Sequence, residues 1–504
     1  MYILAVDLGT TAIKTAVISP EGRVLGKCVK EYTLLTPSPL EVELPVNVYW
    51  DSFKKSVREL IQMTKLAPDE IGVMGMSVQG ETLVLVDQDG EPIHNAIVWM
   101  DNRAQEEADV LDREFPHQLT YEITGQVSIV PTWPAAKILW LKRHRKDLFQ
   151  KTYKFLLLED YFIHRLAGKY VAESSLLSST VYWNMRTKQW WPEMLARLEL
   201  EESRLPEIGE PGQVVGPILP EVAQEIGLSR EMIITTGALD QAAGAIGVGN
   251  IKPGLCSENT GAALAICATV DKPFMDPEFR MPCHYHGIPD LYMAHTFTSG
   301  GMVLKWFRDR FCQQEINVAE AMGKGSYVLL DEEAANVPPG CGGMVMLPHL
   351  EGAMAPEANP KAKGVFYGFT LHHERAHFIR ATMEAIAFIV KRNIDVLTNL
   401  KIPVDEIICL GGGAKSRLWN QIKADVLEKK IVTTANDQDA ACLGAAFIAG
   451  KAVGVYRSLE EAISGSVSVS SEYMPDGARR EVYAEAYTRY VKLYENLVSV
   501  FELP

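Results

Sequence analysis

The chain has 504 residues, of which 47% are apolar and 22% charged, a composition typical of a globular protein with more than one domain. Its 49 basic and 64 acidic residues give a formal net charge of −15, which argues against a nucleic-acid partner and an anionic membrane surface. No apolar run is long enough to span a membrane. Eight scattered cysteines without a Cys-x-x-Cys pair indicate a reducing, cytoplasmic location.

The N-terminal stretch 2–11, YILAVDLGTT, is an apolar strand that carries Asp7 into a turn with one glycine and two hydroxyls. The next apolar run, 13–18, contains Lys14, so the two strands are expected to form a β-hairpin. An ionised carboxylate at the end of a buried strand needs a partner, because burying an unpaired charge is costly. A cation or a phosphate-bound metal would be such a partner. The alternative is an Asp that only bonds turn amides.

A second polar group lies between two apolar strands, expected at 71–77 and 82–87. It consists of Gln79, Gly80 and Glu81. Side chains of this kind between buried strands offer hydrogen bonds to a small polyol.

The segment 97–103, IVWMDNR, repeats this arrangement ahead of a charged helix. Trp99 supplies an apolar face, and Asp101 and Arg103 supply bidentate polar groups, a combination that suits sugar hydroxyls. The alternative is an N-capped surface helix with an internal contact between Asp101 and Arg103.

A third strand, expected at 232–236, runs into GALDQAAGAIG and ends near Asp240 and Gln241. The small residues of the helix that follows allow another element or a ligand to approach its backbone closely, and its N-terminus favours negative charge. Between these regions, 190–204 is predicted to be one amphipathic helix.

The second half begins like the first. A strand at 255–259 leads through Thr260 and Gly261 to a strand at 264–268, a turn with a hydroxyl and small residues that suits phosphate. Gly300 then precedes an apolar helix.

A further strand, 406–410, breaks into Gly411-Gly412-Gly413-Ala414-Lys415-Ser416 before a helix at 419–427. Glycines at this position let the backbone approach a nucleotide. The stretch 337–360, rich in proline and glycine, is expected to be a long active-site loop.

His373 and His377 match the zinc-protease pattern His-Glu-x-x-His. The match falls at the polar start of a predicted helix, where charged residues are usually solvated, and it lacks a clear third ligand. His284 and His286 beside Cys283 are read as strand residues. We therefore do not predict zinc at either place.

Taken together and in this order, four motifs resemble the FGGY carbohydrate kinases: the strand with Asp7-x-Gly-Thr-Thr, Trp99-x-Asp101-x-Arg103, the passage around Asp240, and Gly411 to Ser416. The resemblance implies an α/β chain of two actin-like ATPase (ribonuclease H-like) domains, 1–246 and 247–504, with a cleft between them. It also implies a homodimer as one possible assembly, and it accounts for the repeated architecture.

The resemblance further implies that Mg-ATP lies in the cleft, that Asp240 is the base that accepts a proton from the sugar hydroxyl, and that Asp7 holds Mg²⁺ through water. The N-terminal domain would bind the sugar and the C-terminal domain the adenosine. The implied sugar-binding residues are Gln79, Glu81, Trp99, Asp101, Arg103, Asp240 and Gln241, and the implied ATP-binding residues are Gly9, Thr10, Thr11, Lys14, Thr260, Gly261, Gly300, Gly411, Gly412, Gly413, Ala414 and Ser416.

Departures from the family pattern bear on the substrate. Glycerol kinases carry an Arg where this chain has Gly80 and an aromatic residue where it has Thr132, so a wider pocket is expected, which favours a ketopentose such as D-xylulose. Xylulokinases commonly have a His in place of Glu81, and the turn at 259–262 departs from the Gly-Thr-x-Gly pattern. A kinase for glycerol, gluconate, ribulose or another ketose stays an alternative, and an actin-like chaperone ATPase is a remote one.

Overall fold

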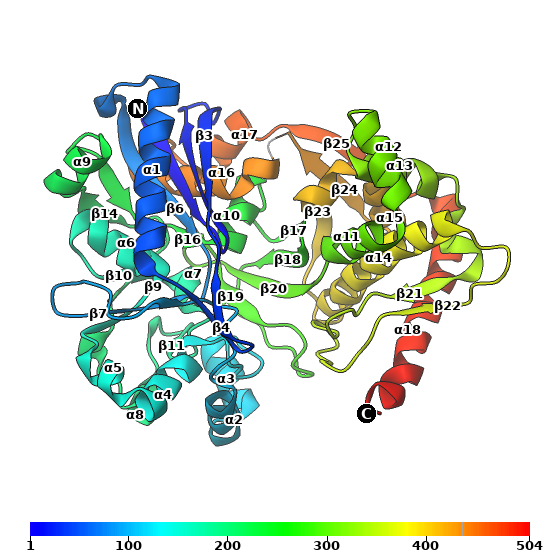
Figure 1. Cartoon of the computed structure of the whole chain (residues 1–504), viewed down its shortest axis with the longest axis horizontal. Helices are drawn as coiled ribbons and strands as arrows, with labels where there is room; N and C mark the ends of the chain where they lie inside the picture. Colours follow the sequence, from blue (N-terminus) through cyan, green and yellow to red (C-terminus); the bar gives the residue numbers. More distant parts are fainter. Residues whose placement is uncertain (436, 504) are drawn as a thin grey trace.

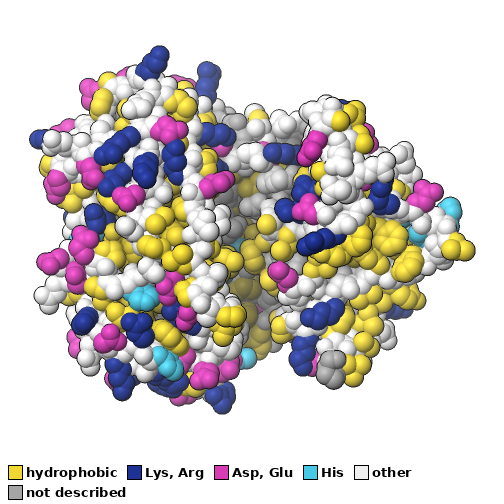
Figure 2. All heavy atoms as spheres, viewed as in Figure 1, with side chains coloured by type: hydrophobic (Ala, Val, Ile, Leu, Met, Phe, Trp, Pro, Cys, Tyr) yellow, Lys and Arg dark blue, Asp and Glu magenta, His cyan; other side chains and the backbone are white. Residues whose placement is uncertain are grey.

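The computed structural model describes residues 1–435 and 437–503; residues 436 and 504, both within the predicted second domain, lie outside the described residues. The chain forms two lobes, each built around a seven-stranded sheet (Figure 1). The surface is hollowed between the lobes (Figure 2). The prediction of an α/β chain with two similar halves is confirmed.

The first sheet has Asp7 near its centre. Apolar residues of β1 are buried on both faces, as expected for a strand covered by helices on either side. β1 pairs antiparallel with β2, with Asp7 opposite Lys14, so the predicted hairpin is confirmed. In sheet order the strands are β14 (Val214–Pro217), β15 (Ile233–Thr235), β6 (Ile71–Val78), β1 (Tyr2–Leu8), β2 (Ala12–Ile18) and β3 (Val24–Glu31), and β16 (Ala238–Leu239) also pairs with β6.

The second sheet repeats this connectivity. β17 pairs antiparallel with β18 and parallel with β23, as β1 pairs with β2 and β6. In sheet order its strands are β19 (Cys283–Tyr285), β20 (Tyr292–Ser299), β18 (Ala263–Val270), β17 (Gly254–Thr260), β23 (Val404–Leu410), β24 (Lys430–Thr434) and β25 (Val469–Tyr473).

Smaller sheets extend both lobes. A five-stranded sheet carries the strands that flank the Gln79 and Trp99 segments. Its strands are β4 (Leu35–Ser38), β5 (Glu41–Leu44), β8 (Ala96–Ile97), β7 (Leu83–Val86) and β9 (Lys154–Leu157), and the two-stranded pairs are β10 (Val171–Glu173) with β13 (Glu207–Gly209), β11 (Trp183–Asn184) with β12 (Gln189–Trp190), and β21 (Val345–Leu347) with β22 (Val365–Tyr367).

Helices cover the sheets of both lobes. In the first lobe they are α1 (Val46–Thr64), α2 (Gln105–Glu114), α3 (His117–Thr124), α4 (Pro134–His144), α5 (Lys146–Lys151), α6 (Leu158–Ala167), α7 (Ser174–Leu177), α8 (Pro192–Leu198), α9 (Pro220–Ile226) and α10 (Asp240–Gly247). Later in the chain come α11 (Gly301–Phe311), α12 (Gln313–Ala321), α13 (Ser326–Ala335), α14 (Arg375–Asn399), α15 (Arg417–Leu427), α16 (Ala440–Ala452), α17 (Leu459–Ser466) and α18 (Arg480–Phe501).

The hydrophobic core does not follow the boundary predicted at 246/247. Buried residues of α16 and α17, late in the chain, belong to the core of the first lobe. Glycines allow α16 to approach: a Cβ on Gly247 would lie 1.8 Å from Ala440 O, and one on Gly444 would lie 1.8 Å from Ala243 O. The small residues of α10 therefore admit another helix, and α10 and α16 pack together between the two sheets.

Two predicted elements were wrong in extent. In place of one helix over 190–204, α8 ends at Leu198 because Glu199 adopts a left-handed conformation, and a separate 3-10 turn, Glu202–Arg204, follows. The predicted active-site loop 337–360 contains a 3-10 turn, Pro339–Gly343, and strand β21, which packs near α18 on the outer side of the second lobe (Figure 1).

Within the described residues, none of the helices combines the length and the apolar character that a membrane crossing would need.

Candidate active site

The two candidate catalytic acids meet because three strands end at the same edge of the first sheet. β1 and β16 both run parallel to β6, one on each side, and Ser77 of β6 lies opposite Asp7 in one pair and opposite Ala238 in the other. Asp240 follows β16 directly, as the first residue of α10. Side chains at the carboxyl ends of parallel strands gather at one edge of a sheet. Asp7 and Asp240 therefore face the same space.

The electrostatics of this space follow from its carboxylates. Burial, followed by the charges of Asp7 and Glu81, raises the pKa of Asp240 to about 7. Burial also raises the pKa of Asp7, while Lys14 and a hydrogen bond from the Ser77 hydroxyl to Oδ1 at 3.1 Å oppose that rise. A carboxylate with a pKa near 7 is a competent proton acceptor at neutral pH.

The first turn, residues 9–12, is held by its backbone. Gly9 N–H donates to Ala12 O at 3.1 Å, and Gly9 O accepts from the Tyr32 hydroxyl and from Gln79 Nε2. Thr10 Oγ1 accepts a 2.9 Å hydrogen bond from Trp99 Nε1, which ties this turn to the predicted sugar end.

Thr11 and Lys14 lie at the rim of the same turn. The Thr11 side chain is exposed. Lys14 Nζ donates to Gln438 O at 3.1 Å, and Gln438 Nε2 in turn donates to Gly411 O at 3.1 Å. This chain of hydrogen bonds joins the first turn to the glycine loop of the second half.

The second turn lies between β17 and β18 and is enclosed by glycines. Gly301 N–H donates to Gly261 O at 3.0 Å. A Cβ on Gly300 would lie 2.4 Å from the Ala263 carbonyl carbon, and one on Gly413 would lie 2.7 Å from the Thr260 side chain. The structure thus brings together the turn and both glycine segments that the sequence singled out.

The glycine loop leads into α15 through a 3-10 turn, Gly412–Lys415. Gly411 has φ 81°, a conformation that disfavours other residues. Ser416 caps α15: its hydroxyl accepts from Trp419 N–H at 3.0 Å. Ala414 O accepts from Asn420 Nδ2 at 2.8 Å. The Ser416 side chain therefore supports the loop, and contact between Gly411 to Ala414 and a nucleotide stays a prediction.

At the sugar end, Gln79 and Glu81 follow β6. Gln79 Nε2 donates to the Tyr49 hydroxyl at 3.1 Å, while Gln79 Oε1 is buried without a protein partner. Glu81 has φ 56°, an unusual value for a residue other than glycine, and burial raises its pKa. Gln241 lies next to Asp240 and donates its backbone N–H to Asp240 Oδ1 at 2.7 Å.

Asp101 and Arg103 bind each other. Arg103 Nε and Nη2 donate to the Asp101 carboxylate at 2.8 to 3.0 Å, and Nη2 also donates to Glu43 Oε1 at 2.7 Å. Asp101 is fully buried, and the Arg103 guanidinium lies 5.1 Å from the Trp140 ring centroid. The internal contact that the sequence left as an alternative is present, so this pair braces the segment that carries Trp99.

Sequence reasoning missed Phe297, which lies on β20 of the second lobe. Its ring centroid is 6.0 Å from that of Trp99 at an angle of 82°, so an edge-to-face pair spans the two lobes beside Thr10. The ring is partly exposed. Nothing in the strand sequence YMAHTFTS, residues Tyr292–Ser299, marks this position as part of a site.

Three buried residues that support Asp240 were also missed. Leu239 N–H donates to Ser175 Oγ at 2.9 Å, and Ser175 Oγ donates to Glu173 Oε1 at 2.7 Å. Gly237 N–H donates to Glu159 Oε1 at 2.6 Å. These contacts hold β16, the strand that presents Asp240, yet Leu239 and Ser175 lie 64 positions apart and Gly237 and Glu159 lie 78 positions apart.

Three ring nitrogens of the His-Glu-x-x-His match are hydrogen-bonded within the protein. His373 Nδ1 lies 3.0 Å from Thr370 N and His373 Nε2 lies 3.0 Å from Cys341 O, while His377 Nδ1 accepts from Glu374 N–H at 3.1 Å. Over residues 1–435 and 437–503, no three His, Cys, Asp or Glu side chains are grouped so as to hold a metal ion.

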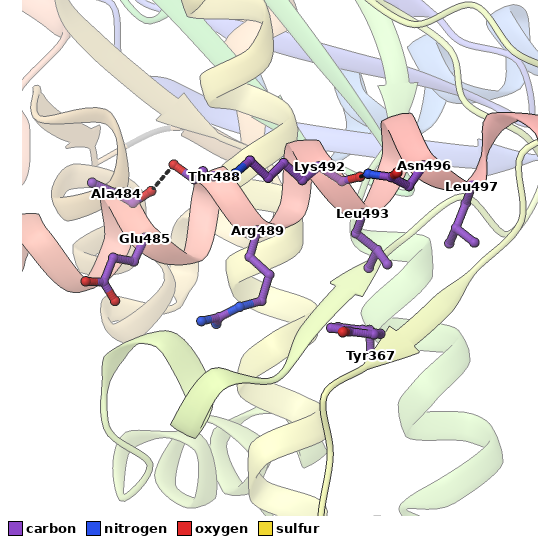
Figure 3. Close-up of a pocket in the computed structure, with 9 residues that line it drawn as sticks. All are labelled: Tyr367, Ala484, Glu485, Thr488, Arg489, Lys492, Leu493, Asn496 and Leu497. Atoms are coloured by element: carbon purple, nitrogen blue, oxygen red, sulfur yellow. Dashed lines mark hydrogen bonds between the residues drawn. The ribbon is translucent and has the colours of Figure 1, made fainter.

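A groove of about 720 Å³ lies elsewhere, along α18 on the outer side of the second lobe (Figure 3). It is lined by Tyr367 and by residues of α18 between Ala484 and Leu497. None of the predicted site residues borders it.

Comparison with known proteins agrees with this geometry. The sequence models of the FGGY family of carbohydrate kinases match residues 2–247 (N-terminal domain) and 267–453 (C-terminal domain). A gluconokinase and a xylulose kinase of Bacillus subtilis (strain 168) are 29% and 28% identical, each over 96% of its own length and over 99% and 98% of this chain. The crystal structure of ligand-bound xylulose kinase from Lactobacillus acidophilus superposes with a TM-score of 0.90 at 28% identity over 99% of both chains.

The predicted fold, two actin-like ATPase domains, is confirmed by this superposition. More than half of the chain matches the family, and the relatives cover nearly all of it. The chain therefore belongs to the FGGY family of carbohydrate kinases and is a sugar kinase.

Proposed function

We propose that this enzyme transfers the γ-phosphate of ATP to a hydroxyl of a neutral ketose, with a ketopentose such as D-xylulose as the substrate. One observation carries the proposal. Asp240, whose pKa is raised to about 7, lies at the sheet edge with Asp7, and the turns and glycine loops expected to hold phosphate lie around the same cleft.

In this reaction Asp240 accepts the proton of the sugar hydroxyl as that oxygen attacks the γ-phosphate. Backbone N–H groups of the turns at 9–12 and 260–263, together with Lys14, offset charge on the phosphate oxygens. Closure of the two lobes excludes water, which would otherwise compete as the acceptor.

Asp7 is the residue that would hold Mg²⁺ through water. Its carboxylate offers the hard oxygen ligands that Mg²⁺ prefers, and a cation would stabilise the charged forms of Asp7 and Asp240, whose pKa values burial raises. A single protein carboxylate is sufficient, because Mg²⁺ in kinases takes most of its ligands from phosphate and water. Bound there, Mg²⁺ would neutralise charge on the phosphates.

The charges at the sugar end favour a neutral sugar over a sugar acid. The guanidinium of Arg103 is engaged by Asp101 and Glu43. Lys137 is fully buried, donates to Val98 O at 2.9 Å, and has a pKa lowered by burial to about 7. A substrate carboxylate would therefore face the carboxylates of Asp240 and Glu81. Neither Arg103 nor Lys137 would offer it a free positive charge, so a sugar acid would bind less tightly than a neutral sugar.

The test is an ADP-release assay with Mg-ATP across ketopentoses, ketohexoses, polyols and sugar acids. We expect kcat/KM for D-xylulose to exceed that for gluconate at least about tenfold, equivalent to about 1.4 kcal/mol. A preference for gluconate would overturn the neutral-sugar argument. Chelation of divalent metal should abolish turnover, and added Mg²⁺ should restore it. Asp240→Asn should remove sugar phosphorylation while ATP still binds.

The cytoplasmic location and a homodimer stay predictions. Light scattering coupled to gel filtration checks the second.

A further inference from the structure

A buried ion pair lies beneath the second turn, outside every motif that the sequence singled out. Glu258 belongs to β17 and Lys423 to α15, and neither side chain is exposed. Lys423 Nζ lies 2.6 Å from Glu258 Oε2. The pair joins the strand that ends in the second turn to the helix that follows the glycine loop.

The Thr260 hydroxyl is the third member of this cluster. It donates to Glu258 Oε1 and accepts from Lys423 Nζ at 3.1 Å. Lys423 Nζ also lies 3.9 Å from Cys409 Sγ and 5.3 Å from the Trp419 ring centroid. The Thr260 side chain is therefore directed into the protein and bonded on both sides.

Stability alone does not account for this pair. Two fully desolvated charges are expensive to bury, and replacing such a pair by apolar residues of similar volume is often neutral or stabilising. The geometric consequence is more specific. Thr260 packs against Gly413, where a Cβ would lie 2.7 Å away, so any rotation of Thr260 would disturb the glycine loop.

We propose that Glu258 and Lys423 are positioning residues that hold the second turn against the glycine loop, and that this turn contacts the phosphates of ATP through its backbone N–H groups and not through the Thr260 hydroxyl. The inference rests on the proposed function, because it assigns the nucleotide to this turn. Neither Glu258 nor Lys423 touches the cleft; both act through Thr260.

The test replaces the whole pair, so that no unpaired charge stays buried. The variant is Glu258→Leu/Lys423→Met. Its matched control is Glu384→Leu/Arg380→Met, which removes a second buried pair, with Nε–Oε1 2.9 Å and side-chain exposures of 2% and 4%, on α14. The control pair binds Tyr483 and Gly340 and contacts none of the predicted site residues.

We expect the Glu258/Lys423 double variant to melt within about 5 °C of the wild type and to raise both KM and the calorimetric Kd for ATP about tenfold, with KM for the sugar within twofold. The control should leave all ATP and sugar constants within twofold. If the double variant does not fold, Glu258→Gln, which preserves shape and one acceptor oxygen, decides the matter: its Kd for ATP should rise at least about threefold.

Two results would overturn the inference. One is a Kd for ATP within twofold of the wild type in the folded variant, and the other is an equal rise of the Kd for ATP in the control variant. The calorimetric measurement needs no sugar. A wild type that binds ATP but phosphorylates none of the sugars tested would refute the proposed function and leave the test of the ion pair intact.

Discussion

Asp240 is predicted to be costly for stability as well as necessary for catalysis. Its folded-state pKa is raised from 3.8 to about 7, so the folded protein binds a proton that the unfolded chain releases as the pH rises from about 4 to 7. Stability must therefore fall over that interval, and the cost is fully present above about pH 7. Asp240→Asn removes the ionisation and should stabilise the ligand-free protein at pH 8.

The magnitude follows from the shift. A rise of about 3 pKa units corresponds to about 4 kcal/mol, an upper bound because Asp240 is partly exposed to the cleft and solvent screens its charge. We expect about 1–2 kcal/mol at pH 8 and about a third of that at pH 5, where only part of the interval has been crossed. For a lobe of this size, 1–2 kcal/mol raises Tm by about 2–8 °C.

Scanning calorimetry without metal or nucleotide at pH 5 and pH 8 measures the rise in Tm that Asp240→Asn causes at each pH. Asp405→Asn, at an exposed strand position, is the control and should change neither Tm. The reasoning is refuted if Asp240→Asn has the Tm of the wild type at pH 8, or if it gains equally at both pH values.

Three further outcomes are expected. kcat/KM should rise with pH and level off above about 7, because Asp240 must be deprotonated to act as the base. Glu81→Gln removes a neighbouring negative charge and should move the inflection of this profile to lower pH. An inflection at the wild-type pH in Glu81→Gln would contradict the prediction. Ser175→Ala deprives Leu239 N–H of its acceptor and should lower kcat about tenfold with both KM values unchanged, whereas a rise in KM alone would argue against a positioning role. Phe297→Ala should raise KM for the sugar about tenfold and leave KM for ATP unchanged. Steady-state kinetics with each substrate varied in turn measures both constants, and an unchanged KM for the sugar would contradict the prediction.

Local sequence patterns were sufficient to predict an element when neighbouring residues alone determine its conformation. The apolar run before Asp7 predicts a strand, the glycine and hydroxyls predict a turn, and the repetition of this pattern at 255–268 predicts a second, similar half. The predicted helix whose polar start carries the His-Glu-x-x-His match is α14, Arg375–Asn399. The predicted ends of a helix were wrong where one residue leaves the helical conformation. Glu199 is the example, because its left-handed backbone ends α8 at Leu198.

Contacts between distant segments could not be read in this way. The sequence predicted Arg103 as a sugar-binding residue. It could not show that Glu43, sixty positions earlier, accepts a hydrogen bond from the Arg103 guanidinium. Phe297 and Lys423 have no local signature, because their partners lie in another lobe or on another element.

Neighbouring residues were enough to predict the α/β class, the two similar halves, the acids Asp7 and Asp240, and the glycine turns, because strand periodicity and turn chemistry are local properties. The folded chain was needed to show that these acids share one sheet edge, that Asp101 and Arg103 bind each other, and that the Thr260 hydroxyl is bonded inward. Burial, charge pairing and pKa depend on what surrounds a group in space, and that is set by the packing of elements far apart along the chain.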